Sequence, residues 1–212
     1  MAGAIDGGAQ KGLMMPPGMS FNAVSDKALA ASKSSKSLKS FWAWDDMLNM
    51  NKIGFFPYTP ATQMLHGLAA GVDMLHEEGL DNVFARHDRL AEATRRAVRA
   101  WGLEVFCQIP AEYSGALTTI LMPEGHNADA LRKAILEKFD MSLGQGLGKI
   151  SGKVFRIGHL GDFNDLMLMG TLSGVEMGLQ VAAVPHKKGG AQAALDYLGD
   201  CAKAPAALKA AA

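Results

Sequence analysis

Apolar residues recur at helical spacing through the middle of the chain, and glycines mark where that spacing stops. Apolar side chains three and four residues apart form one face of a helix. The pattern predicts a helix from Thr62 to Gly79 and a second over residues 80–101, which Gly102 ends. The predicted inward positions are Met64, Leu65, Leu68, Val72 and Leu75 in the first helix and Val83, Leu90, Ala97, Val98 and Trp101 in the second.

The second predicted helix carries a charged face opposite its apolar one. Basic and acidic residues alternate along that face, which is typical of a surface in contact with water. We therefore expect these side chains to be solvent-exposed. They are Arg86, Arg89, Glu92, Arg95, Arg96 and Arg99.

After residue 102 the apolar period changes to two, as in strands, and Pro110, Gly115 and Pro123 bound the alternating runs. Asn127 is the expected N-cap of a further helix. The alternation of strands and helices predicts a small α/β domain. The predicted strands cover residues 103–107, 118–122 and 153–157, and the predicted helices cover residues 128–139 and 164–184.

The two ends of the chain show no such period. The first 20 residues are rich in Gly, Met and Pro and contain no helical period. A short helix is predicted to begin near Ser25, with a run of lysines on a solvated face rather than in a phosphate or nucleic-acid patch. From Ala202 the chain is Ala-rich, and we expect a frayed tail.

Composition limits the class of protein. Hydrophobic residues make up 49% of the chain and the mean hydropathy is +0.06, which predicts a globular protein with a core. The 21 basic and 21 acidic residues balance, which argues against nucleic acid or an anionic membrane as a partner. Cys107 and Cys201 are far apart, so a reducing cytoplasmic location is expected, without a disulfide framework.

One stretch is apolar enough to be considered as a membrane span. Residues 166–184 are largely apolar, but Glu176 and Gln180 interrupt them, and charge in a membrane span is costly. No basic segment followed by an apolar one marks a signal peptide at the N-terminus. We therefore expect a soluble protein, with residues 166–184 in a buried or interface helix.

Two basic residues are candidates for chemistry. Lys11 follows Gln10 and precedes small and apolar residues, and an amine kept out of water loses basicity and can attack carbonyls. The simpler interpretation of Lys11 is an ordinary surface lysine. Arg156 could hold a carboxylate through two hydrogen bonds, which a lysine cannot do. Its simpler interpretation is a structural salt bridge.

Other motifs predict less. The run from Gly144 to Lys149 resembles a phosphate loop, but three residues rather than four separate Gly144 from Gly148, and Ile150 stands where Ser or Thr is needed. The six histidines never form the metalloprotease pattern, so no metal site is predicted. His159 is expected to be packed rather than catalytic.

Four motifs occur in an order that resembles one family. They are residues 10–18, 40–47, 55–62 and 153–161. Together they resemble the C-terminal half of a class V pyridoxal-phosphate-dependent aminotransferase, a fold-type I transferase, and most closely its serine–glyoxylate branch. The resemblance implies transfer of an amino group from serine or alanine to glyoxylate. A desulfurase is not expected, because Cys107 lies in a predicted strand and Cys201 near the tail.

The resemblance also implies roles for single residues. Lys11 would form the Schiff base with pyridoxal phosphate and then move a proton at the substrate Cα. Gln10 and Thr59 would contact the cofactor phosphate, Thr59 across a dimer interface. Phe56 stands where relatives place an aromatic beside that phosphate. Arg156 would bind the substrate carboxylate.

The resemblance further implies a domain organisation. Residues 1–80 would be the end of a cofactor-binding large domain with dimer-interface segments, residues 81–200 a small α/β domain, and residues 201–212 a tail. Relatives carry a further N-terminal half with most cofactor contacts, and residues 2–8 stand in place of the apolar strand that leads to their lysine. We therefore expect a homodimer or a separately supplied N-terminal half. The alternative is an inactive fragment that dimerises or binds a partner.

Overall fold

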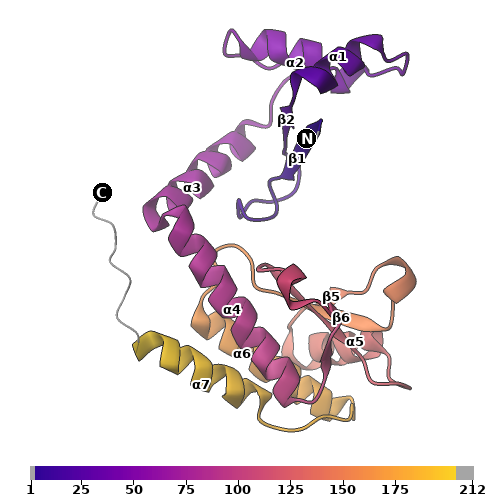
Figure 1. Ribbon diagram of the computed structural model, residues 1–212, viewed down its shortest axis with the longest axis vertical. Helices are drawn as coiled ribbons and strands as arrows, with labels where there is room; N and C mark the ends of the chain where they lie inside the picture. Colours follow the sequence, from indigo (N-terminus) through magenta and orange to yellow (C-terminus); the bar gives the residue numbers. More distant parts are fainter. Residues whose placement is uncertain (1–2, 204–212) are drawn as a thin grey trace. The chain divides into compact units, whose positions relative to one another are not determined.

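The computed structural model describes residues 3–203 (Figure 1). The chain forms two compact units, Met1–Glu77 and Glu78–Ala212, which we call the N-terminal and C-terminal units. Helix α7 (Gly190–Lys203) extends past the point where the tail was predicted to begin. The remainder of that predicted tail lies outside the described residues.

The N-terminal unit begins with a β-hairpin. Strands β1 (Ala4–Gly8) and β2 (Ser20–Val24) pair antiparallel, from Ala4 opposite Val24 to Gly8 opposite Ser20. The prediction that residues 2–8 replace the strand leading to the lysine was wrong, because β1 leads toward Lys11. Glycine and alanine have little strand preference of their own, so the local sequence carries almost no signal. Pairing with β2 supplies the backbone hydrogen bonds instead.

Helices make up the rest of this unit. The helix predicted near Ser25 is confirmed as α1 (Asp26–Ser34), and the Ser25 hydroxyl accepts from the amide of Ala28. Helix α2 (Trp44–Asn51) follows a 3-10 turn (Ser40–Trp42), and neither was predicted. Helix α3 (Thr62–Glu78) ends before Gly79, which adopts the expected left-handed φ of 80°.

The N-terminal unit buries very little. Of residues 3–77, only Ala9, Met15 and Gly71 are buried. The five predicted inward positions of α3 are half-buried, so the helix is confirmed but its core is not found within this unit.

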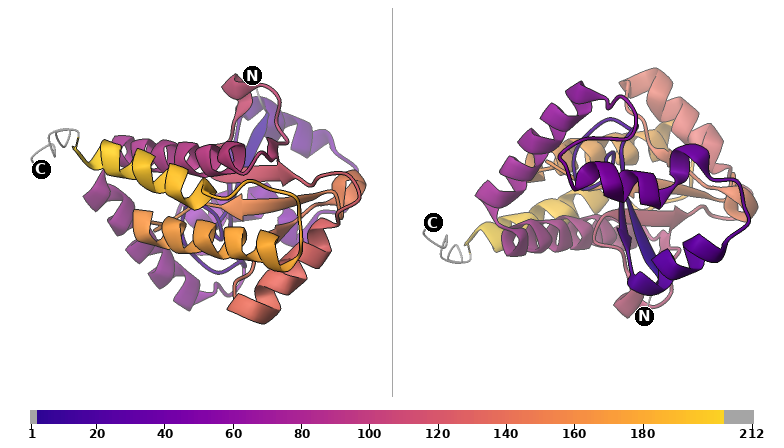
Figure 2. Two further views of the ribbon diagram at one scale, coloured as in Figure 1. Left: turned by 90° about the horizontal axis from the view of Figure 1, so that it is seen from below. Right: turned by 90° about the horizontal axis from the view of Figure 1, so that it is seen from above.

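The C-terminal unit is a four-stranded antiparallel sheet with helices over one face (Figure 2). The strand order is β3-β4-β6-β5, and helices α4, α6 and α7 pack against one another over the core face. The predicted cap is confirmed, because the Asn127 side chain accepts from two amides at the start of α5. The strands are β3 (Glu104–Val105), β4 (Leu117–Leu121), β5 (Gly144–Gln145) and β6 (Val154–Gly158), and the helices are α4 (Leu80–Ala100), α5 (Ala128–Phe139), α6 (Asp165–Val181) and α7 (Gly190–Lys203), with 3-10 turns at Pro110–Glu112 and Gly148–Ile150.

Helix α4 supplies the centre of this core. Its five predicted inward residues are all buried, and Trp101 at its C-terminal end is completely enclosed. They meet residues of α6, α7 and the sheet, among them Ile120, Phe155, Leu172 and Leu198. Within residues 3–203, no helix is both long and apolar enough to cross a membrane.

The charged face of α4 is less exposed than its alternating charges predict. The Arg86 side chain is 17% exposed, because it pairs with Glu78 and donates to the carbonyls of Gly161 and Phe163. The Arg95 side chain is 12% exposed and lies over the Tyr113 ring. Each guanidinium has partners that offset the cost of leaving water, so a charged residue can line a packed surface.

The Glu176 carboxylate connects the start of α7 to α4 and α6 through hydrogen bonds. Glu176 of α6 accepts from the indole N–H of Trp101 at 2.9 Å and from the amides of Gly189 and Ala191 at 2.6 and 2.8 Å. Burial alone would raise the pKa of Glu176, but these three donors outweigh it and lower that pKa below its ordinary 4.5. Glu176 therefore caps the first turn of α7 from another helix.

We expect Glu176→Gln to lower the free energy of unfolding by about 2–4 kcal/mol, because an amide nitrogen would face N–H donors in place of a carboxylate. Thermal and urea unfolding monitored by circular dichroism measure this. Since the folded-state pKa is lowered, the contribution is present above pH 4.5 and is lost as the pH falls below it. Glu137→Gln is the matched control, because Glu137 makes only an exposed ion pair with Lys133 and should change stability by less than about 0.5 kcal/mol. Equal effects of the two variants would contradict the capping role.

Candidate functional site

Lys11 lies in the loop that joins β1 to β2. The Met14 amide donates to the Lys11 carbonyl at 2.9 Å, which closes a tight turn, and Met14 adopts a left-handed φ of 59°. The Lys11 side chain is exposed rather than kept from water. Its apolar neighbours explain the difference, since Ala9 and Met15 turn inward and leave Lys11 and Gln10 on the outer side of the loop.

Two glycines of α3 allow this loop to lie close against the helix. A Cβ at Gly71 would lie 2.7 Å from the Leu13 carbonyl oxygen, and one at Gly67 would lie 3.4 Å from the end of the Met15 side chain. Helix and loop backbones therefore approach more closely than any larger residue at position 71 allows. These positions were not singled out from the sequence, although a glycine inside a helical pattern is the available signal.

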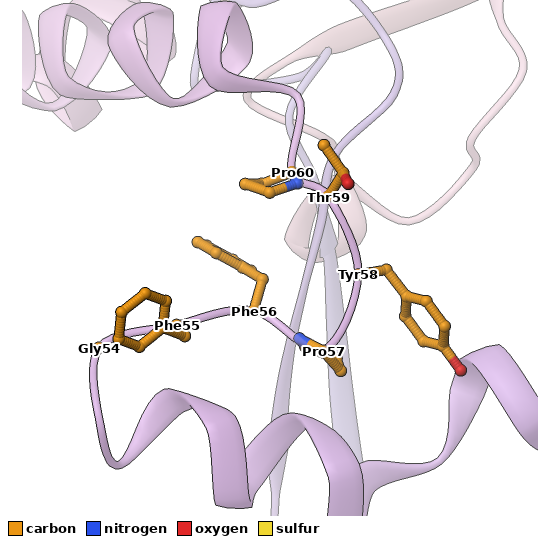
Figure 3. Close-up of a pocket in the computed structure, with 7 residues that line it drawn as sticks. All are labelled: Gly54, Phe55, Phe56, Pro57, Tyr58, Thr59 and Pro60. Carbon is orange, nitrogen blue, oxygen red and sulfur yellow. The ribbon is translucent and has the colours of Figure 1, made fainter.

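Phe56 and Thr59 line one open hollow of about 730 Å³, formed by Gly54–Pro60 (Figure 3). The Tyr58 ring points away from the Phe56 ring and packs against Phe41, with ring centroids 4.8 Å apart. Both Phe56 and Thr59 are exposed. The structure thus brings two of the predicted cofactor contacts together, and places Gln10 and Lys11 on the hairpin loop of the same unit.

Arg156 belongs to the C-terminal unit and lies on the face of the sheet opposite the core. Its neighbours in β6, Phe155 and Ile157, are fully buried, while Arg156 stands opposite Thr119 of β4 and Gly144 of β5. Among the described residues, none forms a hydrogen bond or ion pair with the guanidinium, and its Nε is enclosed without a partner. The structural salt bridge considered for Arg156 is therefore not found in this part of the chain.

His159 is packed, as expected, just beyond the strand of Arg156. Its Nδ1 lies 3.0 Å from the Gly115 carbonyl oxygen and its Nε2 lies 2.9 Å from the Thr118 hydroxyl. A carbonyl can only accept, so Nδ1 carries the proton and Nε2 accepts from Thr118. Burial is the main reason that the pKa of His159 falls from 6.5 to about 4.

The glycine-rich run after α5 forms a tight turn. Gly144 and Gln145 make strand β5, and the chain then turns so closely that a Cβ at Gly146 would meet the Ile150 carbonyl. Only a three-residue 3-10 turn follows, so no helix N-terminus faces this loop as a phosphate loop requires. Within residues 3–203, no three His, Cys, Asp or Glu side chains gather as metal ligands.

The sequence of this chain is similar to those of several known aminotransferases. No family model matches the chain. It is 48% identical over 193 residues to a serine–glyoxylate aminotransferase of Hyphomicrobium methylovorum and 46% identical over 193 residues to that of Arabidopsis thaliana, in each case over 90% of this chain and 48% of the relative. An L-aspartate–glyoxylate aminotransferase of Paracoccus denitrificans is 40% identical over 88% of this chain and 47% of the relative.

Solved structures agree. The pyridoxamine–pyruvate aminotransferase of Mesorhizobium loti superposes with a TM-score of 0.87 at 29% identity, over 94% of this chain and 52% of that one. The chain belongs to the class V aminotransferase family. It spans about half the length of the curated relatives that it matches, and corresponds to their C-terminal half. The predicted fold class is confirmed: this is the α/β C-terminal half of a fold-type I aminotransferase.

We expect the aminotransferase chain to lose stability in mild acid through His159. Because the folded-state pKa is lowered, the neutral imidazole is favoured in the fold, and the unfolded chain takes up the proton first as the pH falls. Stability from this group is present above pH 6.5 and is lost between pH 6.5 and about 4, by about 3 kcal/mol in total. Urea unfolding at a series of pH values measures the loss.

His159→Gln separates this effect from other titrations, because glutamine does not titrate in that range. The variant should be less stable at neutral pH, since it loses one of two buried hydrogen bonds. Its stability should change less between pH 6.5 and 4 than that of the wild type. The same pH slope in both proteins would show that His159 does not carry the dependence.

Proposed function

We propose that this chain supplies the covalent lysine, two phosphate contacts and the carboxylate-binding arginine of a pyridoxal-phosphate-dependent aminotransferase. The observation that carries the proposal is the Arg156 guanidinium, which lies on the face of the sheet opposite the core and makes no hydrogen bond or ion pair within residues 3–203. A guanidinium without a protein partner is suited to an anion, and a planar carboxylate matches its geometry. In this proposal the N-terminal unit is the end of the large domain (residues 1–80), and the C-terminal unit is the small domain (residues 81–200).

The residues of the N-terminal unit fit the cofactor in chemical type. Lys11 is exposed and can reach an aldehyde, Gln10 carries an amide donor, and Thr59 presents an exposed hydroxyl at the hollow. Amide and hydroxyl groups are suited to phosphate oxygens. Phe56 cannot donate a hydrogen bond, so it would contribute a flat apolar wall beside the phosphate.

Each residue then has a separate task. When bound, pyridoxal phosphate withdraws electrons from the substrate Cα, which is chemistry that the protein itself cannot supply. Lys11 Nζ takes a proton from the substrate Cα and returns it during the exchange of the amino group. Arg156 holds the substrate α-carboxylate and so fixes the orientation of the substrate Cα–H bond.

The substrates follow from what the relatives have in common. Three relatives are named for glyoxylate, two of them with serine and one with aspartate as donor. This supports glyoxylate as the amino acceptor for the present chain and serine as a donor, while alanine as a donor stays a prediction from the resemblance. Both substrates carry one carboxylate that Arg156 would bind.

We expect pyridoxal phosphate to attach to Lys11 of the purified chain, because the neighbouring Gln10 offers an amide donor to the cofactor phosphate and other exposed lysines lack this neighbour. Titration with pyridoxal phosphate, borohydride reduction and peptide mass mapping locate the attachment. Lys11→Ala should remove the visible absorption band and the labelled peptide. Lys36→Ala, which changes an exposed lysine of the same unit, should leave both unchanged.

Label spread over many lysines, with no absorption band, would contradict the covalent role of Lys11. That result would favour the alternative of an inactive fragment. Labelling of Lys11 without serine–glyoxylate turnover would instead assign the cofactor site to this chain and the missing activity to residues outside it.

We also propose that another polypeptide segment covers the aromatic surface of the N-terminal unit. This surface consists of Phe41, Trp42, Phe55, Phe56 and Tyr58, which are 46–74% exposed. Exposed apolar surface of this extent is typical of an interface. Since the chain matches only about half of each relative, we assign the cover to a segment corresponding to the unmatched half, either in the same polypeptide or supplied separately. A second copy of the chain is the other expected occupant.

We expect Trp42→Ser combined with Phe55→Ser to weaken complex formation at least ten-fold, because both rings would be buried in it. Light scattering of the chain alone, and together with a polypeptide corresponding to the unmatched half of a relative, measures assembly. Leu166→Ser is the control, because Leu166 is 83% exposed but lies on α6 of the other unit. A chain that stays monomeric under both conditions would contradict the proposed interface.

A further inference from the structure

Gly144 lies beside Arg156 on the face of the sheet opposite the core. The two residues are register partners in strands β5 and β6. A Cβ built on Gly144 would lie 3.0 Å from the Arg156 Cβ and 3.3 Å from its Nε. A side chain at position 144 would therefore press on the stem of the arginine and on the first nitrogen of its guanidinium.

The backbone of Gly144 gives no other reason for a glycine. Gly144 is not among the glycines with a left-handed φ, so any residue could adopt its conformation. Its neighbours in the run differ. Gly148 adopts a φ of 55°, and Gly146 makes room for the Ile150 carbonyl. The space left by the missing side chain at position 144 is occupied by Arg156.

The nitrogens of the Arg156 guanidinium differ in how far they are enclosed by the protein. Nε is enclosed and has no hydrogen-bond partner among the described residues. Neither terminal nitrogen is enclosed in this way, and within residues 3–203 neither donates to a protein acceptor. A carboxylate that approaches Arg156 can therefore reach the two terminal nitrogens but not Nε.

We propose that Gly144 is a positioning residue, whose missing side chain seats the stem of Arg156 so that Nη1 and Nη2 alone face the substrate carboxylate. This inference rests on the proposed role of Arg156 in binding that carboxylate. It adds the mode of binding, with two parallel N–H···O hydrogen bonds from the end of the guanidinium. It also names a residue that determines where this end lies.

Nitrogen NMR of the wild-type chain gives the first measurement, with Arg156→Lys to assign the Arg156 Nε–H signal. That proton should exchange slowly with water, because Nε is enclosed. Exchange as fast as that of a free arginine would overturn the proposal. This measurement needs no ligand and no substituted Gly144, so it remains decisive even if a Gly144 variant does not fold.

Gly144→Ala and Gly158→Ala form a matched pair for the second measurement. Both glycines lie in the same sheet and neither has a left-handed φ, but a Cβ at Gly158 would meet nothing within 4 Å. Gly144→Ala should shift the Arg156 Nε–H signal and weaken the binding of glyoxylate about ten-fold, as expected for a misplaced charge-assisted pair. Gly158→Ala should leave the position of the Nε–H signal unchanged and the affinity for glyoxylate within about two-fold of wild type.

The outcomes separate this inference from the proposed function. If glyoxylate binds wild type and Gly144→Ala equally and the Nε–H signal is unchanged, the positioning role is wrong while carboxylate binding by Arg156 stands. If glyoxylate fails to shift the Arg156 signals of the wild type, carboxylate binding is wrong and the positioning role falls with it. If Gly144→Ala, but not Gly158→Ala, shifts the Nε–H signal and weakens the binding of glyoxylate, both the positioning role of Gly144 and carboxylate binding by Arg156 are supported.

Discussion

The packing of α4 against the sheet and the two C-terminal helices determines the rest of the C-terminal unit. Leu90, Ala97, Val98 and Trp101 are completely buried, and burying a large apolar side chain contributes about 1.5–3 kcal/mol. Trp101 extends this packing into a polar contact, because its indole N–H reaches Glu176, which in turn holds the start of α7. One helix face thereby links the sheet, α6 and α7.

The position of Arg156 is a consequence of the same core. Side chains alternate across a strand, so burying Phe155 and Ile157 necessarily turns Arg156 to the opposite face. A shift of one residue in the register of β6 would bury the guanidinium and expose two large apolar side chains. The free energy that keeps Phe155 and Ile157 buried therefore also keeps Arg156 on the face opposite the core.

The sequence predicts those parts of the fold whose signal is local. The helix at Ala128–Phe139 follows from its period and its Asn127 cap, and the ends of α3 and α4 follow from Gly79 and Gly102. Strand β1 could not be predicted in this way, because Ala4, Gly7 and Gly8 gain their structure from pairing with β2. Partners distant in sequence likewise place Arg86 in a packed surface, and no charge pattern along α4 reveals them.

The sequence likewise predicts the candidate site only in part. Lys11 and Arg156 stand out from the sequence as residue types in distinctive motifs, and the resemblance that they support is confirmed at the level of the family. The exposure of Lys11 was not predictable, because it depends on Ala9 and Met15 turning inward in the hairpin loop. Gly71 and Gly144 act by the space they leave, and only the neighbouring backbone or side chain shows that the space is used.

The scarcity of buried residues in the N-terminal unit has a consequence for the lifetime of the protein in a cell. Quality-control proteases and chaperones act on chains that expose apolar segments, and modest differences in stability change protein abundance several-fold. A chain whose aromatic surface is uncovered would be removed faster than one whose surface is covered. Its steady-state amount would then follow the supply of whatever covers Phe41–Tyr58, and not only the rate of its own synthesis.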